Sequence, residues 1–276
     1  MSDAPAQLDW PVNEPPRTGD EYLRYAEVYD ILFGDIDDDA AFYLGCASSR
    51  LKVGGAVLEL GTGTGRVAAR FLGAGYSVTG VDASAEMLAR SERKLGSFAA
   101  RYRAVHADVR VMELEEHFAL AVAPYGMVAH LLTDDDRLAT FRRVHAHLKP
   151  GGIFVFDDMP AWLGGRADGS RLDLRRTGFD AVAGMPVRLQ SNCIDVAGTS
   201  LSVRYDFVDW MDNGSVARRL VIRVVFRNIA LEDELALLAD AGFEVVEILG
   251  TFDGTPFDRS HITSNHRLII SCRRRS

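Results

Sequence analysis

The chain is poor in cysteine, in basic charge and in long apolar runs, and each shortage excludes a class of protein. Its three cysteines, Cys46, Cys193 and Cys272, are odd in number and far apart. That pattern argues against a disulfide framework and against a closed zinc site. The net charge of -8 disfavours a nucleic-acid partner, because contacts to phosphates normally need a basic surface.

No apolar run approaches the roughly 18 to 20 residues that a membrane span requires, and residues 1–17 contain no apolar signal-peptide core. We therefore expect no membrane partner and a cytoplasmic location. Hydrophobic residues make up 47% of the chain and charged residues 25%, which is typical of a globular protein. The sequence does not fix the oligomeric state, and a homodimer is compatible with it.

The histidines give no converging set of metal ligands. His145 and His147 lie two apart on an expected helix and diverge, while His117, His261 and His266 are isolated. The acidic cluster at residues 35–39 precedes a helical stretch, where the helix dipole alone accounts for acids. We expect no metal centre.

Residues 20–50 are expected to be helical, and from Ala56 onward short apolar runs alternate with helical segments. Alternation of this kind predicts βαβ units and a parallel sheet with both faces covered. Ser84 and Thr133 are placed to cap two of the helices. The expected strands of this region are Ala56–Leu60, Ser77–Val81, Tyr102–His106, Phe118–Ala123 and Ile153–Asp157.

Helical patterning stops between residues 171 and 227. Three β-rich runs take its place, at Val187–Val196, Leu201–Trp210 and Val216–Asn228, with hairpin signals between them. A helix at Leu231–Ala241 and two strands, Phe243–Leu249 and Arg267–Cys272, then complete the chain. The simplest account is a small antiparallel sheet inserted into an α/β domain.

The most informative motif is Gly61-Thr62-Gly63-Thr64-Gly65, directly after an expected buried strand and before a helix. Alternate glycines let the backbone turn tightly and approach a ligand without Cβ obstruction. The next strand ends at Asp82, where a carboxylate can accept hydrogen bonds from both hydroxyls of a ribose. Glu59, two residues before the first glycine, can orient a cationic amine.

A nicotinamide dehydrogenase is the main competitor, because its fingerprint also joins a glycine-rich turn to an acid after the second strand. That fingerprint is G-x-G-x-x-G and serves a pyrophosphate. The spacing here is G-x-G-x-G, which suits a ligand carrying an amino acid in place of a diphosphate. The ending of the chain, a reversed pair of strands, is also absent from such dehydrogenases.

Together these motifs resemble those of class I S-adenosylmethionine-dependent methyltransferases, over residues 57–68, 78–88, 104–110 and 118–157. The match is strongest over residues 20–160. The segment around residues 126–133 is similar to small-molecule members that methylate amino sugars and other metabolite amines. The resemblance implies a doubly wound, mostly parallel seven-stranded Rossmann-like sheet whose last strand is antiparallel. It also implies S-adenosyl-L-methionine as the cofactor and a small molecule as the methyl acceptor.

The resemblance divides the chain into four parts and supplies a set of cofactor-binding residues. The parts are a flexible tail at 1–19, a helical lid at 20–50, a Rossmann-like domain at 51–170 and 228–276, and an antiparallel β substrate cap at 171–227. The expected cofactor-binding residues are Tyr29, Glu59, Gly61, Thr62, Gly63, Gly65, Asp82, Ala83, Met87, Asp108, Val109 and Ala123.

For the acceptor side we expect Tyr25, His130 and Asp158 to act in catalysis. Methyl transfer requires mainly that the acceptor be positioned with a free lone pair, so a base is needed only for a protonated or hydroxyl acceptor. His130 follows the fourth strand and is a candidate base or hydrogen-bonding partner. Tyr125 and Asp157 are further candidates.

The β cap is expected to cover the acceptor site, with the helix that carries Tyr25 and Tyr29 closing the other side. Two other functions stay open at this point: nicotinamide-dependent oxidoreduction and non-catalytic binding of S-adenosylmethionine.

Overall fold

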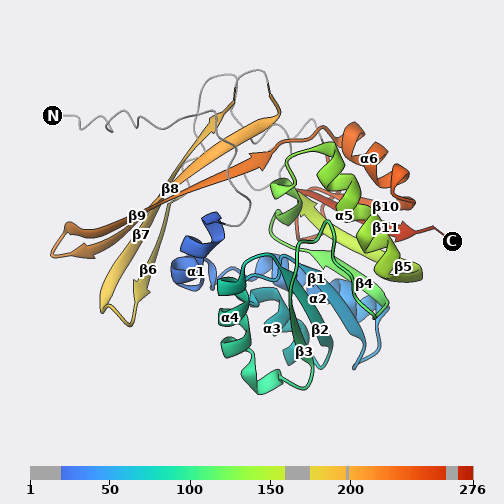
Figure 1. Cartoon of the computed structure of the whole chain (residues 1–276), viewed down its shortest axis with the longest axis horizontal. Helices are drawn as coiled ribbons and strands as arrows, with labels where there is room; N and C mark the ends of the chain where they lie inside the picture. Colours follow the sequence, from blue (N-terminus) through green and yellow to red (C-terminus); the bar gives the residue numbers. More distant parts are fainter. Residues whose placement is uncertain (1–19, 159–174, 197–198, 259–266, 276) are drawn as a thin grey trace.

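The computed structural model describes residues 20–158, 175–196, 199–258 and 267–275 (Figure 1). The predicted tail at 1–19, residues 171–174 of the predicted cap, His261 and His266 lie outside the described residues. The described residues form two β-sheets and the helices that pack against them. Within it, no helix is long and apolar enough to cross a membrane.

The larger sheet has seven strands in the order β10-β11-β5-β4-β1-β2-β3. β11 runs antiparallel to both β10 and β5, and the other neighbours pair in parallel. The predicted seven-stranded Rossmann-like sheet with an antiparallel last strand is therefore confirmed. Its strands are β1 (Ala56–Leu60), β2 (Ser77–Asp82), β3 (Tyr102–His106), β4 (Phe118–Ala123), β5 (Leu148–Asp158), β10 (Phe243–Leu249) and β11 (Leu268–Arg274).

Helices cover both faces of this sheet because its central strands are apolar on both sides, as in β4 with the sequence FALAVA. One core lies against α5 and α6 and includes Phe141, Phe154 and Leu238. The other lies against α2 and α3 and includes Tyr43 and Phe71. The helices are α1 (Asp20–Phe33), α2 (Asp38–Arg50), α3 (Arg66–Gly73), α4 (Ala85–Lys94), α5 (Asp134–His147) and α6 (Leu231–Asp240), with short 3₁₀ turns η1 (Gly96–Phe98) and η2 (Met127–His130).

The two predicted helix caps are present. The Ser84 hydroxyl accepts a hydrogen bond from the backbone N–H of Met87 at 3.3 Å, and the Thr133 hydroxyl accepts one from Asp136 at 3.0 Å. Each satisfies a donor that the first turn of a helix leaves unpaired. Both helices therefore begin at the residue that the sequence indicates.

The second sheet is antiparallel, with strands in the order β6-β7-β8-β9 (Figure 1). Three of its strands, β7 (Met185–Asp195), β8 (Leu201–Asp212) and β9 (Ser215–Arg227), match the predicted β-rich runs. Their last hairpin turns at Asn213 and Gly214, both with positive φ. The fourth strand, β6 (Arg175–Asp180), was missed because its polar sequence RRTGFD belongs to an edge strand.

One boundary prediction is wrong. β5 begins at Leu148 rather than Ile153, because Leu148 already pairs with Phe118 of β4; the backbone then turns at Gly151, with φ 73°, and pairing resumes at Ile153. A register shift between Phe118 and Leu120 of β4 accommodates this irregular start.

Helix α1 lies between the two sheets (Figure 1). Its residues Tyr25, Val28 and Leu32 pack in one cluster with Val208 and Trp210 of the second sheet. The same cluster contains Met87 of α4 and Ala129 of η2 from the larger domain. α1 therefore joins the second sheet to the carboxyl edge of the parallel strands.

Candidate functional site

The glycine-rich turn joins β1 to α3 at the carboxyl edge of the parallel sheet. Gly61 has φ 64°, and a Cβ at this position would stand 2.4 Å from Cγ of Met127. Gly65 has φ 79° and precedes α3; a Cβ there would stand 2.7 Å from Leu95. Both positions combine a left-handed backbone with close packing, so only glycine fits without strain.

Asp82 ends β2 beside this turn. Its two carboxylate oxygens accept hydrogen bonds from the backbone N–H groups of Gly63 and Ser84, each at 2.8 Å. Burial raises the pKa of Asp82, and these backbone donors counteract the shift. The carboxylate is held at the edge of the sheet with lone pairs left for further donors.

Glu59 is 2% exposed, and its Oε2 has no hydrogen-bond partner among the described residues. Burial raises the pKa of Glu59 to about 8, although Arg66 favours the charged form. A buried carboxylate oxygen without a partner is costly, so its presence at the lip of a cavity indicates a ligand that supplies a donor or a positive charge.

Asp108 follows β3 and is held by Arg110. The Arg110 guanidinium donates to the Asp108 carboxylate at 2.6 Å and also pairs with Asp136 at 2.6 Å. Hydrogen bonding to Arg110 keeps the pKa of Asp108 below its ordinary value. The carboxylate is therefore charged and fixed where it borders the cavity.

A cavity of about 340 Å³ opens at this edge and brings distant parts of the chain together. One side consists of the glycine-rich turn and the acids just described. We call this side the cofactor half. Of the predicted cofactor-binding residues, it holds Glu59, Gly61, Thr62, Gly63, Asp82, Ala83, Met87, Asp108 and Val109.

The opposite side is rich in aromatic rings, and we call it the aromatic chamber. It consists of Tyr22, Tyr25, Tyr29 and Phe33 of α1, Tyr125 after β4, and Phe226 of β9. Neighbouring ring centroids on α1 lie 5.1 to 6.2 Å apart. Phe33 lies 6.1 Å from Tyr125, so the rings form a continuous wall.

His130 lies at the end of η2 and lines the same cavity. Its Nε2 forms a 2.6 Å hydrogen bond with the Tyr22 hydroxyl, and its ring packs 4.9 Å from that of Phe226. Burial lowers the pKa of His130 to about 3, and the positive charge of Arg204 acts in the same direction. The imidazole is therefore neutral near pH 7.

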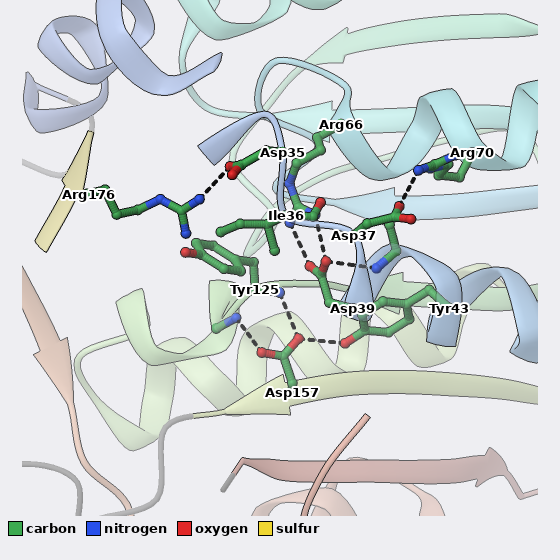
Figure 2. A network of polar contacts seen from close by, with 12 residues as sticks. Asp35, Ile36, Asp37, Asp39, Tyr43, Arg66, Arg70, Tyr125, Asp157 and Arg176 are labelled. Atoms are coloured by element: carbon green, nitrogen blue, oxygen red, sulfur yellow. Dashed lines mark hydrogen bonds and ion pairs between the residues drawn. The ribbon is translucent and has the colours of Figure 1, made fainter. Parts of the chain in front are cut away.

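Asp157 at the end of β5 shapes the turn after β4 (Figure 2). Its carboxylate accepts hydrogen bonds from the Tyr43 hydroxyl at 2.7 Å and from the backbone N–H groups of Tyr125 at 2.7 Å and Gly126 at 2.9 Å. Tyr125 has φ 61°, a rare conformation for a residue with a side chain. Asp157 thus stabilises the backbone that places the Tyr125 ring in the cavity.

A buried ion pair supports the same region from α2. Asp39 accepts two hydrogen bonds of 2.6 Å from the Arg66 guanidinium, which also lies 5.2 Å from the centre of the Tyr125 ring (Figure 2). Two neighbouring acids of the predicted cluster pair separately, Asp37 with Arg70 and Asp35 with Arg176. These acids are engaged by arginines, and the described residues contain no metal-binding cluster.

Three predicted site residues do not line the cavity. Asp158 is fully buried in an ion pair of 2.7 Å with Arg137, which also pairs with Glu234 at 2.5 Å. The structure therefore places Asp158 in the core and not at the cavity where the prediction put it. Ala123 is buried inside the sheet. Gly65 packs against Ser91 and Leu95 at the end of α4, where a Cβ would not fit. Successive strand residues face opposite sides, which is why Asp157 reaches the cavity and Asp158 does not.

Other lining residues were not predicted. Arg204 and Phe226 come from the second sheet, and Tyr22, Arg66 and Arg267 come from segments near α1, α3 and β11. A signal for Arg204 exists, because β8 places Arg204 and Asp206 on the face that also buries Val208 and Trp210. A charged pair on the strand face that also carries buried Val208 and Trp210 suggests a polar site.

Comparison with known proteins agrees with this arrangement. A methyltransferase domain matches residues 57–152. A glycine/sarcosine N-methyltransferase of Halorhodospira halochloris is 32% identical over 148 residues, which are 49% of this chain and 54% of the relative. The chain spans about half the length of curated relatives matched in this way.

Solved structures match over nearly the whole chain. An S-adenosylmethionine-dependent methyltransferase from Clostridium acetobutylicum ATCC 824 superposes with a TM-score of 0.74 at 20% identity, covering 92% of this chain and 99% of that one. A sugar N-methyltransferase from Streptoalloteichus sp ATCC 53650 gives 0.72 at 22% identity, covering 95% and 96%. At these identities the likeness establishes the fold.

The cofactor half fits S-adenosylmethionine. The unpartnered Glu59 oxygen suits the ammonium of its methionine part, Asp82 suits the ribose hydroxyls, and the glycine-rich turn leaves room where a Cβ would obstruct. The matched domain, the sheet order and the fold neighbours agree with this fit. Residues 57–152 thus match a methyltransferase domain, and the chain has the fold of S-adenosylmethionine-dependent methyltransferases.

Proposed function

We propose that this protein transfers the methyl group of S-adenosylmethionine to the nitrogen of a small-molecule amine. The observation that carries the proposal is that one cavity joins the cofactor half to the aromatic chamber. The cofactor, when bound, supplies a methyl group on a positively charged sulfur. The residues of the chain bind it, position the acceptor and exclude water.

The lining of the chamber supports an amine. Methylation of an amine gives an ammonium, and aromatic faces attract such cations. Six aromatic side chains border the chamber, and those of Tyr29 and Tyr125 keep their protons because burial raises their pKa values. Two of the relatives described above are named as N-methyltransferases, one acting on glycine and sarcosine and one on a sugar.

His130 and Tyr22 are proposed to orient the acceptor. Their hydrogen bond joins η2 to α1. It therefore holds α1 in position over the cavity and fixes the orientation of the imidazole ring. The neutral imidazole offers a lone pair or an N–H at no cost of desolvating a charge. We assign His130 to hydrogen bonding rather than to proton removal.

Transfer of isotopically labelled methyl groups tests the function. The purified chain is incubated with labelled S-adenosylmethionine and a panel containing glycine, sarcosine, amino sugars and the corresponding hydroxy compounds. We expect label in amines and little in their hydroxyl counterparts, detected by mass spectrometry. Label in the hydroxy compounds alone would replace the amine with an alcohol, and no label in any compound would contradict the proposed activity.

A further inference from the structure

A buried polar cluster lies behind the aromatic chamber, where α1 meets the second sheet. The Tyr25 hydroxyl donates a hydrogen bond to Oδ2 of Asp206, and the Ser191 hydroxyl donates one to Oδ1. Arg204 donates to Oδ2 of Asp206 at 3.0 Å and to the Tyr25 oxygen at 3.1 Å. Three separate elements, α1, β7 and β8, thus converge on a single carboxylate.

Burying the Asp206 carboxylate costs desolvation free energy that a purely structural role would not require. Asp206 is 0% exposed, and on the same strand face it lies between Arg204, its ion-pair partner, and the apolar Val208 and Trp210. An apolar residue would pack there without the cost of desolvating a charge. Tyr25 lines the cavity while its hydroxyl bonds Asp206, so the cluster connects the chamber to a buried acid.

We propose that Tyr25 and Asp206 form a proton-accepting pair for an amine that enters the chamber as its ammonium. The inference rests on the proposed function and defines the acceptor further, as an amine basic enough to be protonated in solution. Tyr25 touches the acceptor and is the catalytic residue. Asp206 acts through Tyr25 and stores the proton.

The hydrogen-bonding capacity of the phenol allows this step. Tyr25 donates its own proton to Asp206 and accepts one hydrogen bond from Arg204, which leaves one lone pair for the acceptor. Arg204 also stabilises negative charge that develops on the phenolic oxygen during transfer. Its side chain is held over the Phe226 ring at 4.8 Å and so stays in place.

The step balances in atoms and charge. An N–H bond of the ammonium breaks and its proton passes to the Tyr25 oxygen, while the Tyr25 proton moves along its hydrogen bond to Asp206 Oδ2. The freed nitrogen lone pair forms the N–C bond to the methyl carbon. The C–S bond breaks with its electron pair passing to sulfur, so the product carries the positive charge and Asp206 ends neutral.

The surroundings of the pair favour a proton on Asp206 near neutral pH. Burial raises the pKa of Asp206 to about 8. From β9 the register brings apolar Ile222 opposite Asp206 and apolar Val224 opposite Arg204. The titratable groups that face the pair or its arginine are Tyr22 and Tyr29 on α1, Cys193 on β7, Arg204 on β8, and Tyr125 and His130 from the larger domain.

Two single variants and one control test the pair by kinetics. Tyr25→Phe and Asp206→Asn are assayed with sarcosine and with glucosamine as probes. Asp209→Asn is the control, because Asp209 lies three residues along the same strand, is 3% exposed and pairs with Arg188 and Arg219 of the second sheet. Binding of S-adenosylmethionine is measured by calorimetry for every variant.

We expect kcat to fall by about 10² to 10⁴ in Tyr25→Phe and in Asp206→Asn, as for loss of a general base. The wild-type profile of kcat/KM should rise with pH through a midpoint near 8, since the base of the free enzyme must be unprotonated. Asp206→Asn should lose this limb, and affinity for S-adenosylmethionine should stay within about twofold. The double variant should be no slower than the slower single variant, because the two groups act as a unit.

A structural role gives a different result. Wild-type kcat in both variants, or a higher KM with an unchanged pH profile, would overturn the pair. A substrate-free measurement separates this inference from the proposed function. Carbon-13 NMR of labelled aspartate carboxyls, assigned with Asp206→Asn, should show Asp206 titrating near pH 8, and a midpoint below about 5 would overturn the inference even if neither probe is methylated.

Discussion

The two halves of the cavity are built in different ways. The cofactor half comes from the ends of β1, β2 and β3 and the segments that follow these strands of one sheet, and it presents backbone groups and carboxylates. The aromatic chamber comes from α1, η2 and the distant strands β8 and β9, and it presents side chains. The edge of the parallel sheet therefore supplies the cofactor side of this cavity, whereas α1 and the second sheet, which lie outside that sheet, supply most of the acceptor side.

The first prediction concerns the buried ion pair of Asp158, which we expect to contribute to stability and not to the acceptor site. Arg137→Ala should lower the free energy of unfolding by about 3 to 5 kcal/mol, because it leaves Asp158 and Glu234 buried without their partner. Chemical denaturation measures the change, with the exposed Arg142→Ala on the same helix as control. A stable Arg137→Ala protein that has lost only activity would return Asp158 to the acceptor site.

Asp82 tests whether the cofactor half of the cavity binds S-adenosylmethionine. Asp82→Ala removes the acceptor for the Gly63 and Ser84 N–H groups and for the ribose hydroxyls. Affinity for S-adenosylmethionine should fall by about 1.5 to 3 kcal/mol, or roughly 10- to 150-fold. Calorimetric titration measures the loss, and Glu92→Ala on the exposed side of α4 serves as the control. Unchanged cofactor affinity would mean that Asp82 only braces the turn.

His130 tests the assignment of roles within the chamber. Because its pKa is lowered to about 3, the ring is neutral from pH 5 to 9 and contributes no limb to the rate profile there. His130→Ala should lower turnover by about tenfold, the value of one hydrogen bond. His130→Asn should retain much of the rate, since an amide keeps a donor and an acceptor. Loss of an acidic limb in either variant would make His130 the base instead.

Glu59 is tested through the stability of the protein without ligand. Its folded pKa of about 8 lies above the ordinary value of 4.5, so charging it opposes folding progressively from pH 4.5 to about 8. Glu59→Gln removes this penalty, so the variant without cofactor should be more stable at pH 8 than wild type, by about 2 to 4 °C for each kcal/mol gained. The advantage should vanish near pH 4.

Calorimetric scans at both pH values measure it. The same variant should bind S-adenosylmethionine more weakly, because the amide cannot pair with the ammonium. Greater stability at pH 4 than at pH 8 relative to wild type would contradict the argument. Equal cofactor affinity would show that Glu59 does not face the amine.

The sequence predicts the residues of the cofactor half better than those around the aromatic chamber. Glycine spacing and the acids after β2 and β3 lie close along the chain to the strands that position them, so Gly61, Asp82 and Asp108 could be assigned from the sequence. The Asp206 cluster brings Tyr25 of α1 to a carboxylate 181 residues further along the chain, and the two meet only through packing. No local pattern predicts such a meeting.

Face alternation explains the remaining errors. Asp157 and Asp158 are adjacent acids after an apolar run, and only the register of β5 against β11 and β4 determines which one faces the cavity. β6 was missed because an edge strand can be polar on both faces, so its sequence lacks the apolar alternation that predicts a strand.

Calorimetric titration of the wild-type chain tests the central claim most directly, that its cavity pairs an S-adenosylmethionine site with an acceptor chamber. The claim predicts that S-adenosylmethionine and S-adenosylhomocysteine each bind at one site per chain and that NAD gives no heat at the same concentration. Tight binding of NAD, with none of S-adenosylmethionine, would contradict it.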